Sequence, residues 1–360
     1  MFWAAIHAIQ GVQHMRIGAI HRSIGIVLAA FWIAQALSGI AIQFRPEIDD
    51  PALGGATAVD PAAIGRRVET LQSAGDTVGS LWATGGTLGQ FDIYLTRAGE
   101  SRTVRIAGDG TVLRDRADAV LFSDGAVFET LIVFHESLML GRTGELIIGL
   151  SGLFLITTVV LGLKAGWPRR RFLATLFSLK ARALQAQLLS WHRLLGFVFA
   201  VPALIFAAAG VALVWKDGLE HALEAGLPSP DAPPAASGMF ISPGQALSAA
   251  LDRYPHAAIA ALTLPGDDRP WYRIRLRAPG EMPRQYGATT LYIAAAGGSV
   301  LLDHDARKSD GARLFIEALY PVHTGQVGGL AGRVLSAAFG LWLLAMIAIG
   351  LLRWRSRRVR

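Results

Sequence analysis

The sequence predicts an α-helical membrane protein with four transmembrane helices, arranged as two tandem repeats, and two extracytoplasmic α+β modules. Three observations lead to this prediction: long apolar stretches, a separation of charges along the chain, and a motif pattern that occurs twice. Of the 360 residues, 52% are hydrophobic and only 17% are charged, whereas soluble domains carry about 25% charged residues. The apolar excess is concentrated in four stretches, which excludes an ordinary soluble domain.

These four stretches are long enough to cross a membrane as helices. The hydrocarbon core of a bilayer is about 30 Å thick, which requires about 20 consecutive apolar residues. None of the four contains a charged residue. The stretches are Ser23–Phe44, Leu146–Leu163, Leu194–Trp215 and Val334–Leu352. Buried helices of a large soluble protein are the alternative, but four such runs with basic ends are unusual in soluble folds.

Basic residues are concentrated on one side of these stretches. Residues 1–22, 164–193 and 353–360 together hold 14 Lys and Arg and no acidic residue, whereas the rest of the chain holds 20 basic and 27 acidic residues. The positive-inside rule therefore places both termini and the 164–193 loop in the cytoplasm and the segments at about 45–145 and 216–333 outside. The net charge of +7 thus reflects membrane topology, and we expect no nucleic-acid partner.

Each outer segment has the pattern of a helix followed by antiparallel strands. In the second segment, Ser242 can cap a helix that starts at Pro243, and Gly297-Gly298 has the composition of a hairpin turn. In the first segment, Pro61–Ser73 has a helical pattern. The expected strands are Phe91–Arg97, Ser101–Ala107, Trp271–Arg277, Thr290–Ile293 and Ser299–Leu302.

These patterns divide the chain into segments that alternate between membrane and solvent. The expected segments are a cytoplasmic interfacial helix (1–20), the first transmembrane helix (21–44), the first outer module (45–130), a lead-in helix with the second transmembrane helix (131–167), a basic cytoplasmic loop (168–190), the third transmembrane helix (191–215), the second outer module (216–318), a lead-in helix with the fourth transmembrane helix (319–353) and a basic tail (354–360).

Two motif patterns occur twice, which indicates an internal duplication. His21 and His192 are each followed by Arg, and a glycine lies 18 residues after each of these histidines. His135 and His323 are each followed by glycines after 6, 9 and 27 residues. The most distant glycines of the patterns are Gly39, Gly210, Gly162 and Gly350. The four histidines are therefore expected in two layers, one at each face of the membrane.

Two imidazoles at the same depth suit the axial ligation of a b-type haem, whose porphyrin fills an apolar gap between helices. The chain has no cysteine, which excludes iron–sulfur clusters and covalent c-type attachment. We predict two haems, with His21 and His192 as iron ligands in one layer and His135 and His323 in the other. Haem propionates need cations, and arginine pairs well with carboxylates. The candidate cations are Arg22, Arg193, Arg142 and Arg333.

Other interpretations of the histidines remain open. A single histidine at the end of a span is often an interfacial residue with a polar tip, and a zinc or copper ion would need further ligands. His14, two helical turns before His21, is an alternative ligand. No Asp, Glu or Lys lies inside the predicted spans, which argues against a proton-driven transporter.

Taken together, these motifs resemble the PepSY-associated transmembrane family, and the resemblance covers nearly the whole chain. It lies in His21-Arg-x-x-Gly with the apolar span that follows, Phe134-His135-Glu-Ser-Leu, Trp167-Pro-Arg-Arg, Trp191-His192-Arg193 and Leu319-Tyr-Pro-Val-His323-Thr-Gly. The segment from Ile241 to about Asp305 resembles a PepSY module, and the first outer segment resembles a more divergent one. The family includes iron-regulated proteins of the bacterial inner membrane, some similar to periplasmic ferric-siderophore reductases. The resemblance thus implies haem ligation by the four histidines.

The first functional hypothesis is a haem oxidoreductase that reduces an extracytoplasmic ferric chelate, such as a ferric siderophore, by outer-sphere electron transfer. This reaction needs no general acid, base or nucleophile, so no catalytic side chain is predicted. The chain lacks a Gly-x-Gly-x-x-Gly motif, so we expect electrons from a separate quinol or flavoprotein. Outer side chains that could contact an anionic chelate are Tyr272, Arg273, Arg275, Arg277, Tyr286 and Tyr320.

Two other hypotheses do not require haem. The outer modules could bind a peptide or protein by strand addition, which would make the chain a non-enzymatic, membrane-anchored regulatory protein. The chain could also be a subunit of an iron-uptake or respiratory complex.

Overall fold

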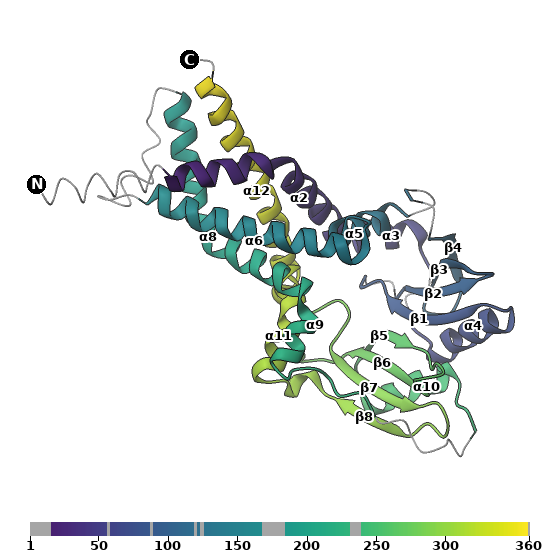
Figure 1. The fold of residues 1–360 in the computed structure, drawn as a ribbon. Helices are drawn as coiled ribbons and strands as arrows, with labels where there is room; N and C mark the ends of the chain where they lie inside the picture. Colours follow the sequence, from purple (N-terminus) through teal and green to yellow (C-terminus); the bar gives the residue numbers. More distant parts are fainter. Residues whose placement is uncertain are drawn as a thin grey trace, which may run out of the picture.

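The computed structural model describes residues 16–55, 58–86, 89–118, 121–122, 126–167, 184–230 and 239–358. A bundle of apolar helices is joined to an eight-stranded antiparallel sheet (Figure 1). Most of the expected interfacial helix at 1–20, including His14, lies outside the described residues, as do most of the expected loop at 168–190 and the last two residues of the expected tail.

Within the described residues, three helices of the bundle are long and apolar enough to cross a membrane. They are α6 (Gly141–Gly166), α8 (Leu184–Val214) and the segment Gln326–Ser356, which joins the 3-10 turn η2 (Gln326–Gly328) to α12 (Gly329–Arg358). A fourth span is present if the helix Arg16–Val27 and α2 (Ala29–Gln43) count as one, although they meet at an angle of 60°. The chain is therefore a multi-pass membrane protein, and its first predicted span is bent at Leu28.

The sheet is built from two groups of elements with the same order, a helix followed by four strands. The first group is α4 (Pro61–Ser73), β1 (Thr77–Ala83), β2 (Phe91–Arg97), β3 (Glu100–Ile106) and β4 (Val112–Ala117), and the second is α10 (Pro243–Arg253), β5 (Ala258–Thr263), β6 (Trp271–Arg277), β7 (Thr289–Ala294) and β8 (Val300–His304). Strands β1 and β5 pair at Ser80↔Thr263, Leu81↔Leu262 and Trp82↔Ala261. The expected two modules thus form one sheet of order β4-β3-β2-β1-β5-β6-β7-β8.

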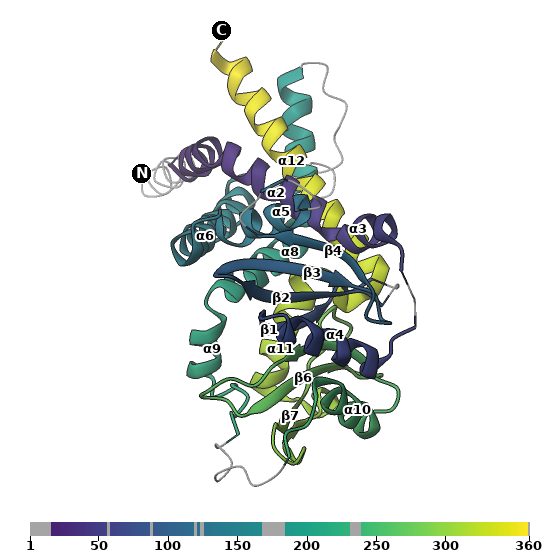
Figure 2. The ribbon, with the colours of Figure 1, turned by 90° about the vertical axis from the view of Figure 1, so that its right-hand side faces the viewer.

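Capping and alternation explain why these segments fold locally as they do. Asp60 caps α4, and Ser242 forms a capping box with Gln245 at the start of α10, which satisfies backbone N–H groups of the first turn. In β6, Ile274 and Leu276 are buried in the hydrophobic core under α4 and α10. Because side chains alternate along a strand, the arginines of β6 belong to the opposite face of the sheet. Helices α4 and α10 cover one face of the sheet, and the helices of the bundle lie beyond the other (Figure 2).

Short helices connect the sheet to the bundle. They are α3 (Arg45–Leu53), α5 (Val127–Ser137), α9 (Lys216–Ala222) and α11 (Gly311–His323), with the 3-10 turn η1 (Ala306–Lys308) before α11. A buried ion-pair network joins α3 and α5 to the sheet. Arg105 donates to Asp92 at 2.7 Å and to Asp49 at 2.8 Å, and Arg45 bridges Asp92 and Glu129. Buried charges are tolerated when they are paired in this way.

Candidate functional site

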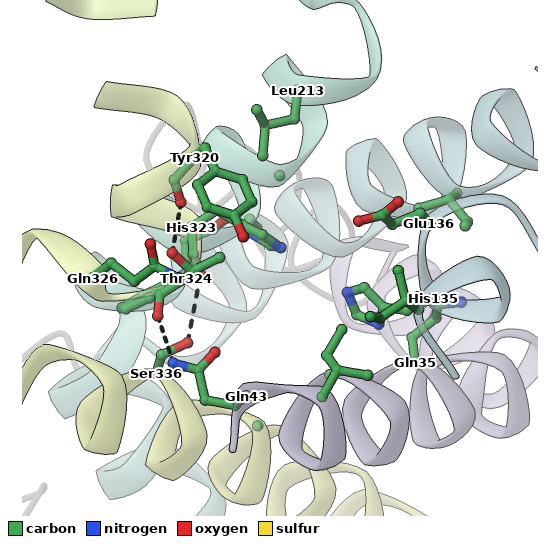
Figure 3. A pocket seen from close by; sticks show the side chains of 18 of the residues that line it. Gln35, Gln43, His135, Glu136, Leu213, Tyr320, His323, Thr324, Gln326 and Ser336 are labelled. Atoms are coloured by element: carbon green, nitrogen blue, oxygen red, sulfur yellow. Dashed lines mark hydrogen bonds between the residues drawn. The ribbon is translucent and has the colours of Figure 1, made fainter. Parts of the chain in front are cut away.

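The four histidines singled out by the repeated motifs come together in two pairs. His135 of α5 and His323 of α11 have ring centroids 6.4 Å apart and ring planes inclined by 32°. Figure 3 shows these two rings facing each other from opposite walls of a cavity. His21, on the helix Arg16–Val27, and His192 of α8 have ring centroids 6.0 Å apart and ring planes inclined by 71°. We refer to them as the outer pair (His135 and His323) and the inner pair (His21 and His192).

Each of the four rings lies beside a glycine of a neighbouring helix. A Cβ atom added to the glycine would lie 2.6 to 3.9 Å from Cε1 of the facing histidine. The four contacts join Gly39 to His135, Gly162 to His21, Gly210 to His323 and Gly350 to His192. These are the glycines at the ends of the duplicated patterns, so their spacing from the histidines has a direct structural meaning: three of them leave no room for a side chain without displacing an imidazole.

Backbone carbonyls one turn before these glycines orient two of the rings. Nδ1 of His21 lies 2.9 Å from the carbonyl oxygen of Thr158, and Nδ1 of His323 lies 3.0 Å from that of Phe206. Because a carbonyl oxygen only accepts, Nδ1 carries the proton and donates it. The Nε2 atom then keeps its lone pair, which is the form in which histidine binds a metal.

A hydroxyl group holds His135 in the same tautomer, with the proton on Nδ1. The Ser38 hydroxyl donates its hydrogen to the carbonyl oxygen of Gln35 at 3.0 Å and lies 3.1 Å from Nδ1 of His135. Since that hydrogen is already used, Ser38 accepts from Nδ1, and Nε2 of His135 is again unprotonated. Burial, and the repulsion that a proton on His135 would meet from a protonated His323, lower the pKa of His135 to about 4. Both rings of the outer pair are thus neutral near pH 7. Nδ1 of His192 is buried and has no hydrogen-bond partner among the described residues.

A cavity of about 870 Å³ contains the outer pair. Its membrane side is lined by the two histidines and their glycines together with Phe206 and Ser336, and its sheet side by Arg277, Arg284, Gln285 and Tyr286. The volume falls in the range of about 300–1,000 Å³ that is usual for sites of small molecules and cofactors. The outer pair therefore stands at the inner end of a space that opens toward the sheet.

The histidine spacing permits a shared metal ion in both pairs. An imidazole nitrogen lies about 2 Å from a bound metal ion, so two rings on opposite sides of one ion have centroids roughly 6 Å apart. The observed separations of 6.0 and 6.4 Å agree with this value. Within the described ranges, no three His, Cys, Asp or Glu side chains group as a metal site. Each pair therefore offers two nitrogens and leaves the remaining coordination to a ligand such as a porphyrin.

The four arginines predicted to bind propionates lie in different surroundings. Arg142 and Arg333 line the outer cavity. Arg142 is paired with Glu145 at 2.7 Å, and Nη2 of Arg333 lies 2.8 Å from Glu47. Arg22 is exposed, whereas the Nε atom of Arg193 is buried and has no partner among the residues that the structure describes. A role in propionate binding stays a prediction for all four arginines.

The predicted chelate contacts are partly corrected. Arg277, Tyr286 and Tyr320 line the outer cavity. Tyr272 does not, because it is buried in the core and its hydroxyl donates to the carbonyl oxygen of Ile241. Arg273 and Arg275 belong to the same face of β6 as Arg277 but do not line the cavity.

Two residues near the sites escaped the sequence analysis. Arg284 lies in the irregular segment between β6 and β7 and lines the outer cavity; no periodic pattern marks such a position. Arg353, near the end of α12, interacts electrostatically with both rings of the inner pair. In the sequence, Arg353 is one of the basic residues near the C-terminus, and these predicted only that this end lies in the cytoplasm.

The comparison with known protein families gives one match. The sequence pattern of the PepSY-associated TM region matches residues 19–357, which contain all four histidines, the glycines beside them and the whole sheet. No curated protein matches the sequence.

Proposed function

Because this chain belongs to the family of the PepSY-associated TM region, we propose that it is an electron-transfer protein with two b-type haems that reduces a ferric chelate, such as a ferric siderophore. In this proposal the protein lies in the bacterial inner membrane, with its termini in the cytoplasm and its sheet in the periplasm. The observation that carries the proposal is the geometry of the two histidine pairs: matched separations, orienting Nδ1 hydrogen bonds and glycines at the ring edges.

We further propose that the chain is two tandem repeats, each with one PepSY-like module. The contacts support this reading because they are reciprocal. Exchange of the two halves converts the contact between His21 and Gly162 into that between His192 and Gly350. In the same way, the contact between His135 and Gly39 becomes that between His323 and Gly210, and the order of one helix and four strands also occurs in each half.

The residues of the chain fit a haem in each pair. The histidines would hold the iron through Nε2, and the hydrogen bonds at Nδ1 of His21, His135 and His323 would keep these three imidazoles in the ligating tautomer. Gly39 and Gly210 allow the rings of the outer pair to sit close to the helices, and Phe206 contributes an apolar wall. When bound, the haems supply one-electron redox chemistry. Phe339 stacks on Phe206, and Trp342 packs against Phe339, so these rings extend the apolar wall.

The orientation proposed for the membrane follows from the position of the charges. The C-terminal end of α12, with Arg353 and Arg355, lies at the end of the bundle away from the sheet (Figure 1). The positive-inside rule favours the cytoplasm for this end. The inner pair then faces a cytoplasmic or membrane electron donor, for which a quinol or a flavoprotein is suitable, and the outer cavity faces the ferric chelate.

Reduction of the chelate would consist of the transfer of one electron to Fe(III), which becomes Fe(II). No bond of the chelator is broken, so no nucleophile or general acid is required. Fe(II) is a softer ion that binds oxygen ligands less tightly than Fe(III), and the reduced iron is released more readily.

An absorbance spectrum tests the proposal. Protein purified in detergent from haem-replete cells is expected to show a b-type Soret band with two haems per chain, and dithionite should sharpen the α band. His135→Ala or His323→Ala should each lose one haem, whereas the control His256→Ala, which changes an exposed histidine far from both pairs, should keep both. A colourless protein would overturn the proposal and would leave a membrane-anchored binding protein as the function.

A kinetic experiment tests the reaction itself. Dithionite-reduced protein, freed of excess reductant, is mixed with a ferric chelate, and the reduced α band is followed. Reoxidation with formation of Fe(II) is expected, and an unchanged band in the presence of several ferric chelates would contradict reductase activity while leaving haem binding intact.

A further inference from the structure

The cations around the outer cavity differ in whether they have an acidic partner. Six basic side chains line the cavity, and four of them form ion pairs: Arg45, Arg142, Lys216 and Arg333. The other two, Arg277 and Arg284, form no ion pair with any residue in the described part of the chain. These two arginines both lie at the sheet end of the cavity, so the charge that remains available to a ligand is concentrated there.

Arg284 is a half-buried cation with incomplete hydrogen bonding. Its Nη1 donates to the backbone oxygen of Glu317 at 3.1 Å, and its guanidinium lies 6.0 Å from the centre of the Tyr320 ring. Its Nε is buried and has no partner among the described atoms. Burial lowers the pKa of Arg284, but arginine keeps its charge near neutral pH. A desolvated charge with a free N–H is costly unless an acceptor, best an anion, completes it.

The neighbouring strand adds positive charge, which the carboxylate of Glu281 offsets only in part. Arg275 stands beside Arg277 on the same face of β6, with its guanidinium 5.6 Å from the centre of the Trp82 ring. Burial, together with the positive charges of Arg284 and Arg273, lowers the pKa of Arg275 to about 10. A bound anion would relieve this repulsion between cations.

Acidic residues offset the charge of this end only in part, because Glu281 and Glu317 interact electrostatically with Arg284 but form no ion pair with it and are engaged by other partners. Glu145 is paired with Arg142, and Asp217 is exposed. Glu136 lies on the opposite wall, across the cavity from Tyr320 (Figure 3). Tyr320 stands beside Tyr286, with ring centroids 6.0 Å apart, and its hydroxyl points into the cavity (Figure 3), where it can donate to an anionic oxygen.

From these observations we propose that Arg277 and Arg284, assisted by Tyr320, bind a carboxylate at the sheet end of the outer cavity. The inference rests on the proposed function, which supplies two sources of this group: a propionate of the outer haem, or a carboxylate of an anionic ferric chelate. Arginine suits either source because its planar fork matches a carboxylate.

The test compares Arg284→Gln and Arg277→Gln with Arg273→Gln, which removes one exposed positive charge from the same strand outside the cavity. Two quantities are measured for each variant: the haem content, from the absorbance spectrum, and the affinity for gallium(III) citrate, a redox-inert anionic analogue of ferric citrate, by calorimetry. Loss of one of two haems in the cavity variants identifies a propionate. Two retained haems with an affinity for gallium citrate reduced about tenfold or more identify a chelate carboxylate.

Both of these results require that Arg273→Gln behaves as the wild type. The proposal is overturned if both cavity variants keep two haems and bind gallium citrate as the wild type does. It is also overturned if both variants keep two haems and the wild type itself binds no gallium citrate, or if Arg273→Gln causes the same losses. If Arg284→Gln fails to fold, Arg277→Gln decides, because the Arg277 side chain makes no ion pair with the residues described.

The outcome also separates this proposal from the haem proposal. A colourless wild-type protein that binds gallium citrate through Arg284 would refute haem binding and keep the carboxylate site. A haem-containing wild type whose variants show no change would support haem binding and refute the carboxylate site.

Discussion

Replacement of Gly210 by alanine tests the link between the glycines and the histidine pairs most directly. The new Cβ would lie 2.6 Å from Cε1 and 2.8 Å from Nδ1 of His323. Carbon atoms in contact prefer a separation of about 3.5–4.0 Å, so the imidazole has to move by roughly 1 Å. That movement breaks the match between the ring separation of 6.4 Å and the value of roughly 6 Å for two imidazoles on one metal ion.

Two opposing energies act on this variant. Crowding of a packed site costs about 1–3 kcal/mol, whereas alanine in place of glycine inside a helix stabilises by up to about 1 kcal/mol. We therefore expect a net loss of up to about 3 kcal/mol in the free energy of unfolding. The larger effect should be on the cofactor: Gly210→Ala is expected to lose the outer haem, about half of the Soret absorbance per chain.

Gly350 supplies the matched control. A Cβ at this position would lie 3.9 Å from Cε1 of His192, which is an ordinary contact, so Gly350→Ala should keep both haems and melt slightly higher. The assay is haem per protein by pyridine haemochrome, together with thermal melting of the detergent-solubilised protein. If Gly210→Ala keeps two haems with an unchanged spectrum, the glycine does not position His323 and the reasoning is wrong.

Three further predictions concern the two pairs and the ion-pair network. The angle between the two imidazole planes that would hold an iron sets the splitting of its d orbitals. Electron paramagnetic resonance should therefore show two low-spin signals, a resolved rhombic one from the outer pair, whose planes are inclined by 32°, and a strongly anisotropic one from the inner pair, whose planes are inclined by 71°. A single signal would contradict this prediction. Arg45→Met leaves the buried Asp92 and the half-buried Glu129 without that partner and should cost about 3–5 kcal/mol of unfolding free energy, whereas Arg66→Met at an exposed pair should change melting little. Burial raises the pKa of Asp92, but the hydrogen bonds and the charge of Arg105 outweigh this effect and lower the pKa below its usual value. The ionised Asp92 therefore stabilises the fold above about pH 4, and this stabilisation should be lost as the pH falls further. An acid titration followed by circular dichroism measures this loss.

Regular elements with clear alternation were predictable from the sequence. Helix Pro61–Ser73 and strands Phe91–Arg97 and Trp271–Arg277 have the predicted bounds, because their apolar residues repeat with the period of the element. Strand β5 was missed since all but its ends are buried and its sequence, Ala258–Thr263, has no polar alternation. Strand β1 was missed because a register shift between Val78 and Ser80 interrupts its pattern.

Tertiary features were predictable only where the sequence repeats itself. The repeated spacing from histidine to glycine led to the grouping of histidines, and the structure brings those four residues together as two pairs. The union of two modules into one sheet depends on the short pairing of β1 with β5, which leaves no local signature. The position of Arg284 depends on how an irregular segment folds against α11, so its role could not be deduced from composition.

Each histidine pair takes one member from residues 16–167 and the other from residues 184–358. Neither half of the polypeptide therefore contains both histidines of a pair. A half produced alone has one histidine of the inner pair and one of the outer pair, each without its partner. The halves would have to be co-expressed to complement each other, and cleavage between them need not abolish assembly, since β1 and β5 hold them together at the sheet. A half-length chain that pairs with itself about a twofold axis would provide the same two ligand sets, which makes such a homodimer a concrete target for protein design.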